Sequence, residues 1–174
     1  MSLRGRAWKY GRNVNTDVII PGRYCNLSDP RELAKHCMED LDPDFVHKIS
    51  PGDLIVAGSN FGCGSSREVA PISLKAAGIA AIIAPSFARI FYRNAINIGL
   101  PIFECPEAYE GIEEGHEVEI DPRSGVIHNL TTGASFRATP FPEFMQKIMA
   151  RGGLLGYVEE RLMERDQQAG GNKN

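Results

Sequence analysis

Short apolar runs alternate with helix-spaced apolar positions in the centre of the chain. The runs at residues 53–57, 79–84 and 100–103 have the length of buried strands. Between them, residues 67–77 and 87–98 place apolar side chains at the spacing of one helix face. This order predicts a β-α-β unit with parallel strands, followed by a second helix and a further strand.

The N-terminal part carries shorter elements. Residues 3–10 predict an opening strand, and residues 17–20 (DVII), which are mostly apolar, predict another short strand. Ser28-Asp29-Pro30 supplies N-cap and first-turn signals for a helix that continues to about Met38. Residues 41–50 are polar and contain proline, so we expect a connector with one helical turn.

The pattern changes in the last third. Residues 117–137 alternate in short runs separated by turn signals, which predicts antiparallel hairpins in a second, small sheet. Residues 140–149 and 153–165 carry helical patterns. We therefore expect one domain over residues 1–166. Because residues 167–174 are polar and rich in Gly and Asn, we expect a disordered tail after it.

A polar, glycine-rich segment, GSNFGCGSSRE, interrupts this apolar framework at residues 58–68. It lies between a predicted strand and a predicted helix, so backbone N–H groups at the helix start would face whatever binds there. Its three glycines permit positive φ and a close backbone approach. The hydroxyls of Ser65 and Ser66 and the guanidinium of Arg67 suit a small anion with several carboxylate or phosphate groups.

A purely structural interpretation of this segment is also open. Ser65 and Glu68 have the S-x-x-E spacing of a capping box, in which the serine only starts the helix. Pro71 argues against so early a start, because it would remove a hydrogen bond inside that helix. From these residues alone, a helix cap and a binding loop remain alternatives.

Composition and charge narrow the classes of function. The 174 residues, 43% of them hydrophobic, are enough for one substantial core. The net charge of −3 argues against nucleic acid as a partner, because nucleic-acid binding needs a basic face. No apolar run reaches the length of a membrane span, and the N-terminus lacks the apolar region of a signal peptide. We therefore expect no membrane association and a cytoplasmic location.

The cysteines and histidines predict no metal site in this chain. Cys25, Cys37, Cys63 and Cys105 are scattered without a C-x-x-C pair, as in reduced cytoplasmic thiols rather than a disulfide framework. The four histidines lack H-x-x-x-H spacing. Although Cys63 lies in the glycine-rich segment, we expect it to pack a tight turn rather than to bind a metal.

Four segments that span most of the chain carry a family resemblance. They are residues 16–21 (TDVIIP), 60–68 (NFGCGSSRE), 86–95 (SFARIFYRNA) and 152–155 (GGLL). In this order they resemble the swivelling domain of the aconitase superfamily, and most closely the separate small subunits of its 3-isopropylmalate dehydratase and homoaconitase branch. The resemblance implies an α/β fold, a swivelling β/β/α domain of three layers with a mainly parallel sheet and a small second antiparallel sheet.

The resemblance also implies a hydro-lyase of leucine biosynthesis, the synthesis of a branched-chain amino acid. Such an enzyme removes and re-adds water, and so moves a hydroxyl between adjacent carbons of a hydroxy di- or tricarboxylate. In relatives a [4Fe–4S] cluster acts on the hydroxyl as a Lewis acid. A cluster needs grouped thiolates, which this chain lacks. The resemblance therefore implies a heterodimer in which a large partner subunit carries the cluster.

Individual residues receive roles from the same resemblance. It implies that Ser65 is the base, stabilised as an alkoxide by backbone N–H groups and the Arg67 cation. Arg67 would bind a substrate carboxylate through its planar fork, and Ser66 would add a hydroxyl. Asp17 and Thr16 would lie beside the active site, where the acid orients or protonates the departing water. Turn chemistry before a strand is the alternative for this pair.

The loop Tyr24-Cys25-Asn26-Leu27 faces the variable substituent of the substrate in such relatives. A cation at its third position would suit the extra carboxylate of homoaconitate. Asn26, flanked by Cys25 and Leu27, instead favours an apolar or small substituent, such as the isopropyl group of 3-isopropylmalate. Homoaconitate, citramalate and dimethylmalate remain alternatives.

Two further alternatives concern partners and class. Arg89, Arg93 and Asn97 form a polar stripe, which is either a solvated helix face or a contact with a partner chain or substrate. The glycine-rich segment could also serve a non-catalytic anion-binding module. Its serine pair and the separate acid favour the enzyme, because a plain anion site has no need of a base.

Overall fold

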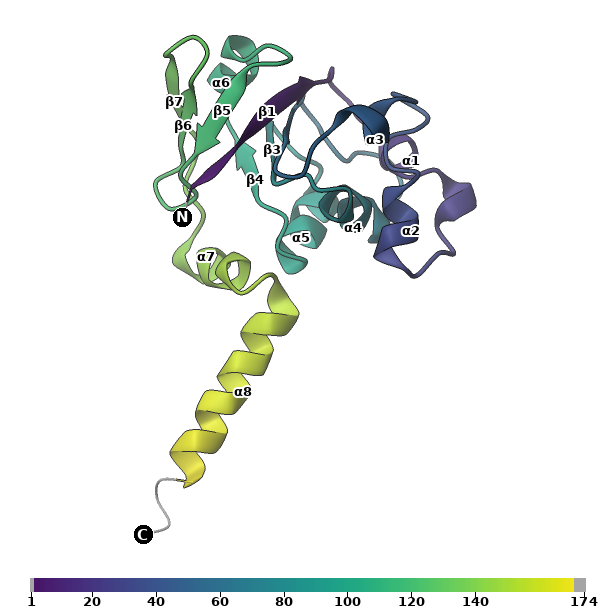
Figure 1. Ribbon diagram of the computed structural model, residues 1–174. Coiled ribbons are helices and arrows are strands. Elements are labelled where there is room, and N and C mark those ends of the chain that lie inside the picture. Colours follow the sequence, from purple (N-terminus) through teal and green to yellow (C-terminus); the bar gives the residue numbers. More distant parts are fainter. Residues whose placement is uncertain (1, 171–174) are drawn as a thin grey trace.

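The computed structural model describes residues 2–170 and contains a sheet of seven strands, in the order β4-β3-β2-β1-β5-β6-β7 (Figure 1). The strands are β1 (Leu3–Lys9), β2 (Leu54–Val56), β3 (Ala81–Ala84), β4 (Ile102–Glu104), β5 (Glu117–Ile120), β6 (Val126–Asn129) and β7 (Ser135–Arg137). The pairs from β1 to β4 are parallel, and those from β1 through β5 and β6 to β7 are antiparallel. This arrangement confirms the predicted α/β class with a parallel and an antiparallel part.

The two parts are joined by β1 instead of forming separate sheets. Residues 3–6 pair with β5, where Leu3 lies opposite Ile120. Residues 7–9 pair with β2, where Ala7 lies opposite Leu54. Because β1 is long enough to serve both neighbours in turn, the predicted second sheet is a continuation of the first.

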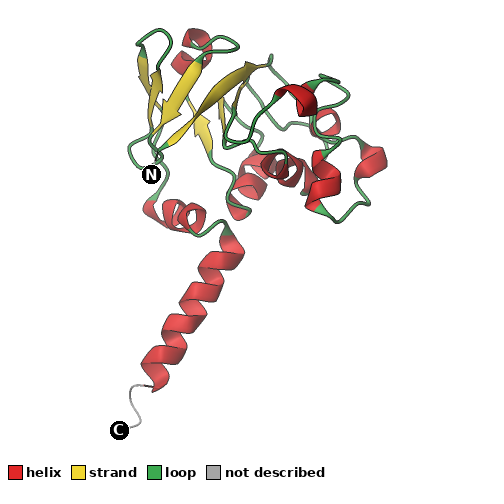
Figure 2. Ribbon diagram, viewed as in Figure 1, coloured by secondary structure: helices red, strands yellow, loops and turns green. Residues whose placement is uncertain are grey.

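The helices and one 3-10 turn lie between and after these strands (Figure 2). They are α1 (Thr16–Ile19), η1 (Gly22–Tyr24), α2 (Pro30–Ala34), α3 (Phe45–Lys48), α4 (Val69–Ala76), α5 (Arg89–Asn97), α6 (Pro106–Gly111), α7 (Glu143–Ala150) and α8 (Leu154–Gly170). The helical turn expected in the connector is α3. The helix α2 ends earlier than predicted, and the short α6 has no counterpart among the predicted elements.

The predicted strand at residues 17–20 is wrong, because most of this run belongs to helix α1. Asn15 is the N-cap, and its Oδ1 accepts a hydrogen bond of 2.8 Å from the backbone N–H of Asp17. This cap starts a helix where the apolar residues alone suggested a strand. Thr16 and Ile19 are both buried, one helical turn apart.

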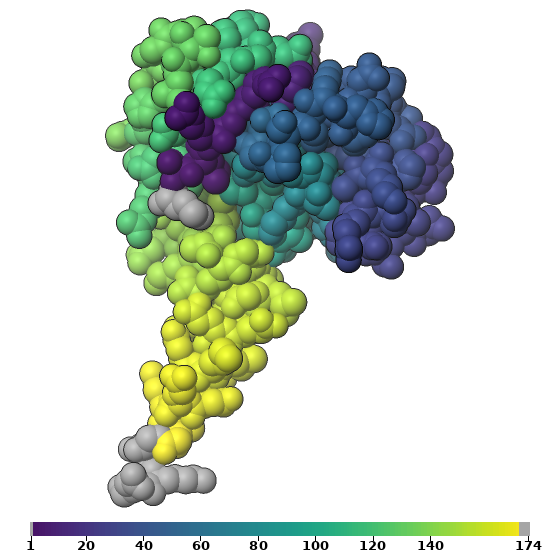
Figure 3. All heavy atoms as spheres, in the orientation of Figure 1, coloured from purple at the N-terminus to yellow at the C-terminus, as the bar shows by residue number. Residues whose placement is uncertain are grey.

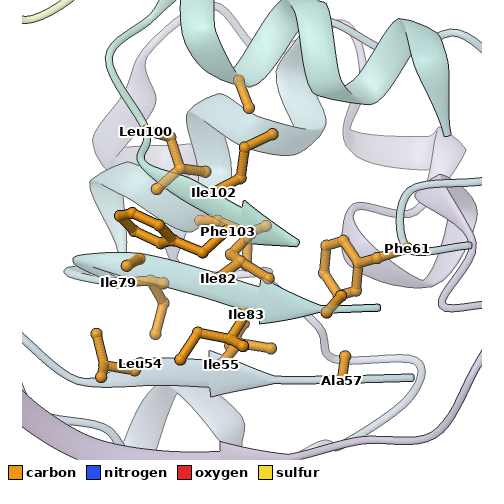
Figure 4. Close-up of a cluster of buried hydrophobic side chains, with 14 of the residues drawn as sticks. Leu54, Ile55, Ala57, Phe61, Ile79, Ile82, Ile83, Leu100, Ile102 and Phe103 are labelled. Atoms are coloured by element: carbon orange, nitrogen blue, oxygen red, sulfur yellow. The ribbon is translucent and has the colours of Figure 1, made fainter. Parts of the chain in front are cut away.

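The apolar runs of the parallel strands form the centre of the core. All residues of β2 and β3 are buried, as is usual for parallel strands covered on both faces. Phe61, from the segment after β2, is fully buried and lies at the end of β3 (Figure 4). Its ring contacts Phe87 and Phe91 edge-on, with centroids 6.0 and 5.2 Å away. Phe61 therefore anchors the glycine-rich segment to the core.

Helix α8 extends away from the rest of the molecule (Figures 1 and 3). It continues to Gly170, so the expected disordered tail is wrong for residues 167–170. The remainder of that tail, residues 171–174, lies outside the described residues. Within the described range, no helix is long and apolar enough to cross a membrane.

Candidate active site

The glycine-rich segment connects β2 to α4 as a tight turn. Gly62 and Gly64 have φ angles of +82° and +89°, in the left-handed region that favours glycine. A Cβ on Gly62 would lie 2.2 Å from the Phe91 ring, and a Cβ on Gly64 would lie 2.5 Å from the Asn15 side chain. Both positions therefore require glycine, because of the backbone angle and because of the close contact.

Hydrogen bonds join this turn to the start of α1. The backbone N–H of Gly62 donates to the Val14 carbonyl at 2.8 Å. The backbone N–H of Thr16 donates to the Cys63 carbonyl at 2.8 Å. The hydroxyl of Thr16, which is buried, donates to the Ser65 carbonyl at 2.6 Å. The start of α1 therefore fixes the backbone at Ser65.

Ser65 does not cap the following helix. The helix α4 begins at Val69 with Glu68 as its N-cap, and no capping hydrogen bond from a side chain is present there in the described structure. Pro71 is consequently the third helical residue, where an N–H has no intrahelical partner in any case. The capping-box interpretation is wrong, and both Ser65 and Ser66 are exposed.

Ser65, Ser66 and Arg67 line a pocket of about 280 Å³. The start of α5 and the residue before it contribute Ala88, Arg89, Ile90, Phe91 and Asn94, and the remaining lining residues are Thr16, Gly62 and Gly64. Among the described residues, the backbone N–H groups of residues 65–67 have no protein acceptor. These donors are therefore available to a ligand.

Arg67 is held from several sides. Its Nη2 lies 2.6 Å from Oδ1 of Asp17, and its Nη1 donates to Sγ of Cys25 at 2.6 Å. A Cβ on Gly22 would lie 3.2 and 3.3 Å from these two nitrogens, so the guanidinium packs over this glycine. The Cys25 contact and the Asp17 carboxylate raise the pKa of Arg67 above its ordinary value. Its Nε is buried and has no hydrogen-bond partner in the described part of the chain.

The loop expected to set substrate choice is turned partly inward. Tyr24 stacks on His36, with ring centroids 3.7 Å apart and an interplanar angle of 7°. The sulfur of Cys25 is directed at Arg67. Asn26 is exposed, while Leu27 after it is half-buried. Asn26 is therefore the residue of this loop that is most available to a substrate.

Of the pocket residues on α5, only Arg89 was a candidate in the sequence, as part of the polar stripe, and Ile90, Phe91 and Asn94 were not. Ile90 is 53% exposed and lies in the first turn of α5, which begins two residues later than predicted. Arg89 and Arg93 are exposed, and Arg89 lines the pocket. The available signal for the others was the segment 86–95, which matched the family pattern although its apolar residues had no assigned site role.

The residues present do not fit an iron–sulfur cluster held by this chain. No group of three or more His, Cys, Asp or Glu side chains in the described residues is arranged to hold a metal ion. Burial raises the pKa of Cys37 to about 12 and also raises the pKa of Cys105 above its ordinary value. Both thiols are therefore held in the protonated form, whereas cluster ligands are thiolates.

Comparison with known proteins agrees with this fold. The family model of the aconitase C-terminal domain matches residues 12–107. The 3-isopropylmalate dehydratase small subunit of Caldicellulosiruptor bescii is 64% identical over 162 residues, which are 93% of this chain and 98% of that protein. The 2,3-dimethylmalate dehydratase small subunit of Eubacterium barkeri is 63% identical over 158 residues, which are 91% of this chain and 97% of that protein.

A solved structure is similar along nearly the whole chain. The crystal structure of 3-isopropylmalate dehydratase from Methanocaldococcus jannaschii superposes with a TM-score of 0.92 at 45% identity, covering 97% of this chain and 99% of that chain. The chain therefore belongs to the aconitase C-terminal domain family. The resemblance inferred from the four sequence segments is confirmed.

Proposed function

We propose that the chain is the small subunit of a 3-isopropylmalate dehydratase, a cytoplasmic hydro-lyase of leucine biosynthesis. The observation that carries the proposal is the pocket that contains Ser65, Ser66 and Arg67, with Asp17 paired to the arginine. The proteins from C. bescii and M. jannaschii that bear this name support it, because they match this chain over nearly their full length.

Ser65 would be the base that removes a proton from a substrate carbon. A serine hydroxyl is a poor base unless its alkoxide is stabilised. Here the free N–H groups of residues 65–67 and the charge of Arg67 lie in the same turn and would provide that stabilisation. The hydroxyl would then return the proton to carbon when water is added back.

Arg67 would bind a substrate carboxylate, and Ser66 would donate its hydroxyl to the same group. The raised pKa of Arg67 keeps the guanidinium charged, which supports this role. Asp17 would orient the guanidinium and the departing water, since its carboxylate is 51% exposed while paired to Arg67. Thr16 would hold the Ser65 backbone in place through its 2.6 Å hydrogen bond.

A large partner subunit would complete the site. The pocket is open, and Ser65 and Ser66 are exposed beside it, which supports a site that a second chain closes. That subunit would hold the [4Fe–4S] cluster, which supplies a Lewis acid for the leaving hydroxyl. The contribution of this chain is limited to the base, the carboxylate-binding groups and the loop near the substituent.

We propose that the substrate is one of two closely similar hydroxy acids. The relatives named for 3-isopropylmalate and for 2,3-dimethylmalate are 64% and 63% identical to this chain, so identity does not separate them. The exposed Asn26 favours a substituent without an additional charge. We propose 3-isopropylmalate as the substrate and retain 2,3-dimethylmalate as the second candidate.

Reconstitution tests this function. The purified chain alone is expected to be colourless and inactive, and mixing it with a cluster-loaded large subunit is expected to produce turnover. The kcat/KM values should be compared for 3-isopropylmalate, 2,3-dimethylmalate and homoaconitate, with Ser65→Ala as the control for background. Turnover by the chain alone, or a complex that acts on none of these acids, would contradict the proposal.

A further inference from the structure

Cys25 lies in the loop near the expected substituent, but its sulfur contacts Arg67. The Arg67 Nη1 donates to the sulfur at 2.6 Å, across 42 residues of sequence. The sulfur also lies 3.7 Å from the Pro21 carbonyl. Sulfur is a weak acceptor, but a charged donor strengthens such a contact.

The loop is wound around the guanidinium. The 3-10 turn η1 is closed by a hydrogen bond of 3.1 Å from the Cys25 N–H to the Gly22 carbonyl. Gly22 lies against the guanidinium, where a side chain would come within 3.3 Å of both terminal nitrogens. The same short turn therefore supplies a surface for Arg67 to pack on and an acceptor for one of its nitrogens.

Two acceptors restrict the orientation of the Arg67 guanidinium more than one acceptor can. The Asp17 carboxylate holds Nη2 and leaves the guanidinium plane free to rotate about that contact. A second acceptor on Nη1 removes this freedom, because two contacts and the packing surface define the plane. The buried Nε, which has no partner in the described residues, is then held in one direction.

We propose that Cys25 is a positioning residue for Arg67, so that the substituent loop and the carboxylate-binding guanidinium form one unit. The inference rests on the proposed function, in which Arg67 binds a substrate carboxylate. Cys25 itself does not touch the carboxylate. It acts by restricting the guanidinium to one orientation before the substrate arrives, which lowers the entropy cost of binding.

A pair of substitutions separates this role from simple packing. Cys25→Ser retains an acceptor atom, whereas Cys25→Val retains an apolar side chain of similar bulk without an acceptor. In the assembled enzyme, Cys25→Val is expected to raise the KM for 3-isopropylmalate about 10-fold, the order expected for a lost hydrogen bond to a charged group. The kcat of Cys25→Val is expected to change less than about twofold. The KM of Cys25→Ser is expected to stay close to the wild-type value, because the acceptor atom is retained. A Val variant with normal KM beside an impaired Ser variant would overturn the proposal in favour of packing.

A second substrate separates positioning from direct contact with the substituent. A 3-alkylmalate with a smaller branch, such as 3-methylmalate, has the same two carboxylates. If Cys25 acts through Arg67, Cys25→Val raises the KM for both substrates by the same factor. An increase in KM for 3-isopropylmalate alone would show that the Cys25 side chain contacts the branch of the substrate instead, and would overturn the proposal.

A double-mutant cycle on the isolated full-length chain keeps the inference testable if the proposed function fails. The urea midpoint is measured for Cys25→Val, Arg67→Met and both together. Because the two side chains are in contact, the combined shift is expected to be smaller than the sum of the single shifts. Additive shifts would overturn the inference, whereas a coupled pair in an enzyme without dehydratase activity would refute only the function.

Discussion

The Thr16 hydroxyl donates a 2.6 Å hydrogen bond to the Ser65 carbonyl, so a buried side chain of α1 holds the backbone of the proposed base. Thr16→Val replaces this hydroxyl by a methyl group of similar size and leaves the carbonyl without its donor. We expect kcat to fall about 10-fold and stability to fall by about 1–2 kcal/mol, as for other lost buried hydrogen bonds. Steady-state kinetics of the assembled enzyme and urea unfolding of the chain measure the two effects.

Thr16→Ser is the control for that experiment, because it keeps the donor and removes only a methyl group. Its kcat should remain near the wild-type value. Equal losses in the Val and Ser variants would assign the effect to packing of the methyl group instead.

Ser65→Ala is expected to remove most turnover while leaving the fold and the pairing with the large subunit intact. Ser65 is exposed and makes no capping hydrogen bond, so the loss of stability should stay below about 0.5 kcal/mol. Single-turnover kinetics and a pull-down with the large subunit check both parts. Unchanged turnover would remove the serine from the mechanism.

Arg67→Lys is expected to weaken substrate binding more than it slows turnover. A lysine offers one point charge, whereas Arg67 contacts Asp17 and Cys25 through two nitrogens at the same time. We expect the KM for 3-isopropylmalate to rise about 10- to 100-fold, which corresponds to about 1.4–2.8 kcal/mol. A normal KM in this variant would mean that the carboxylate is bound elsewhere.

Asn26→Arg is expected to shift substrate preference toward homoaconitate. An additional carboxylate beside the exposed Asn26 would lose water without gaining a cation, and arginine at this position would supply one. An apolar branch is favoured there by burial, by about 0.8 kcal/mol for each carbon removed from water. The ratio of kcat/KM for the two substrates measures the change. A wild-type preference for homoaconitate would show that another residue reads the extra carboxylate.

The parallel centre of the fold could be predicted because β2 and β3 are buried on both faces and therefore appear as continuous apolar runs. The same reasoning failed for residues 17–20, where apolar residues alone do not separate a short strand from one helical turn. There the decisive feature is the side chain of Asn15, which caps α1. The joining of the two sheet parts also escaped prediction, since it depends on pairing between residues far apart in sequence, such as Leu3 and Ile120.

The candidate site was predictable where its residues are close in sequence or lie in a segment that carries the family resemblance. The structure places Ser65, Ser66 and Arg67 at one pocket and Asp17 beside the arginine, as the family resemblance led us to expect. The contact between Cys25 and Arg67 and the exposure of Ile90 depend on how separate elements cross. No local spacing rule encodes such crossings.

The position of β1 has a consequence for folding during synthesis. This strand leaves the ribosome before the rest of the sheet, yet residues 3–6 find their partners only in β5, after residue 117 has emerged. Until then one side of the strand presents unpaired backbone groups, which favour aggregation. Pairing over so long a separation also slows folding, because the loop must close before the contact is made. Shortening the chain before β5 would therefore remove a partner of β1 and leave β1 as an exposed edge strand.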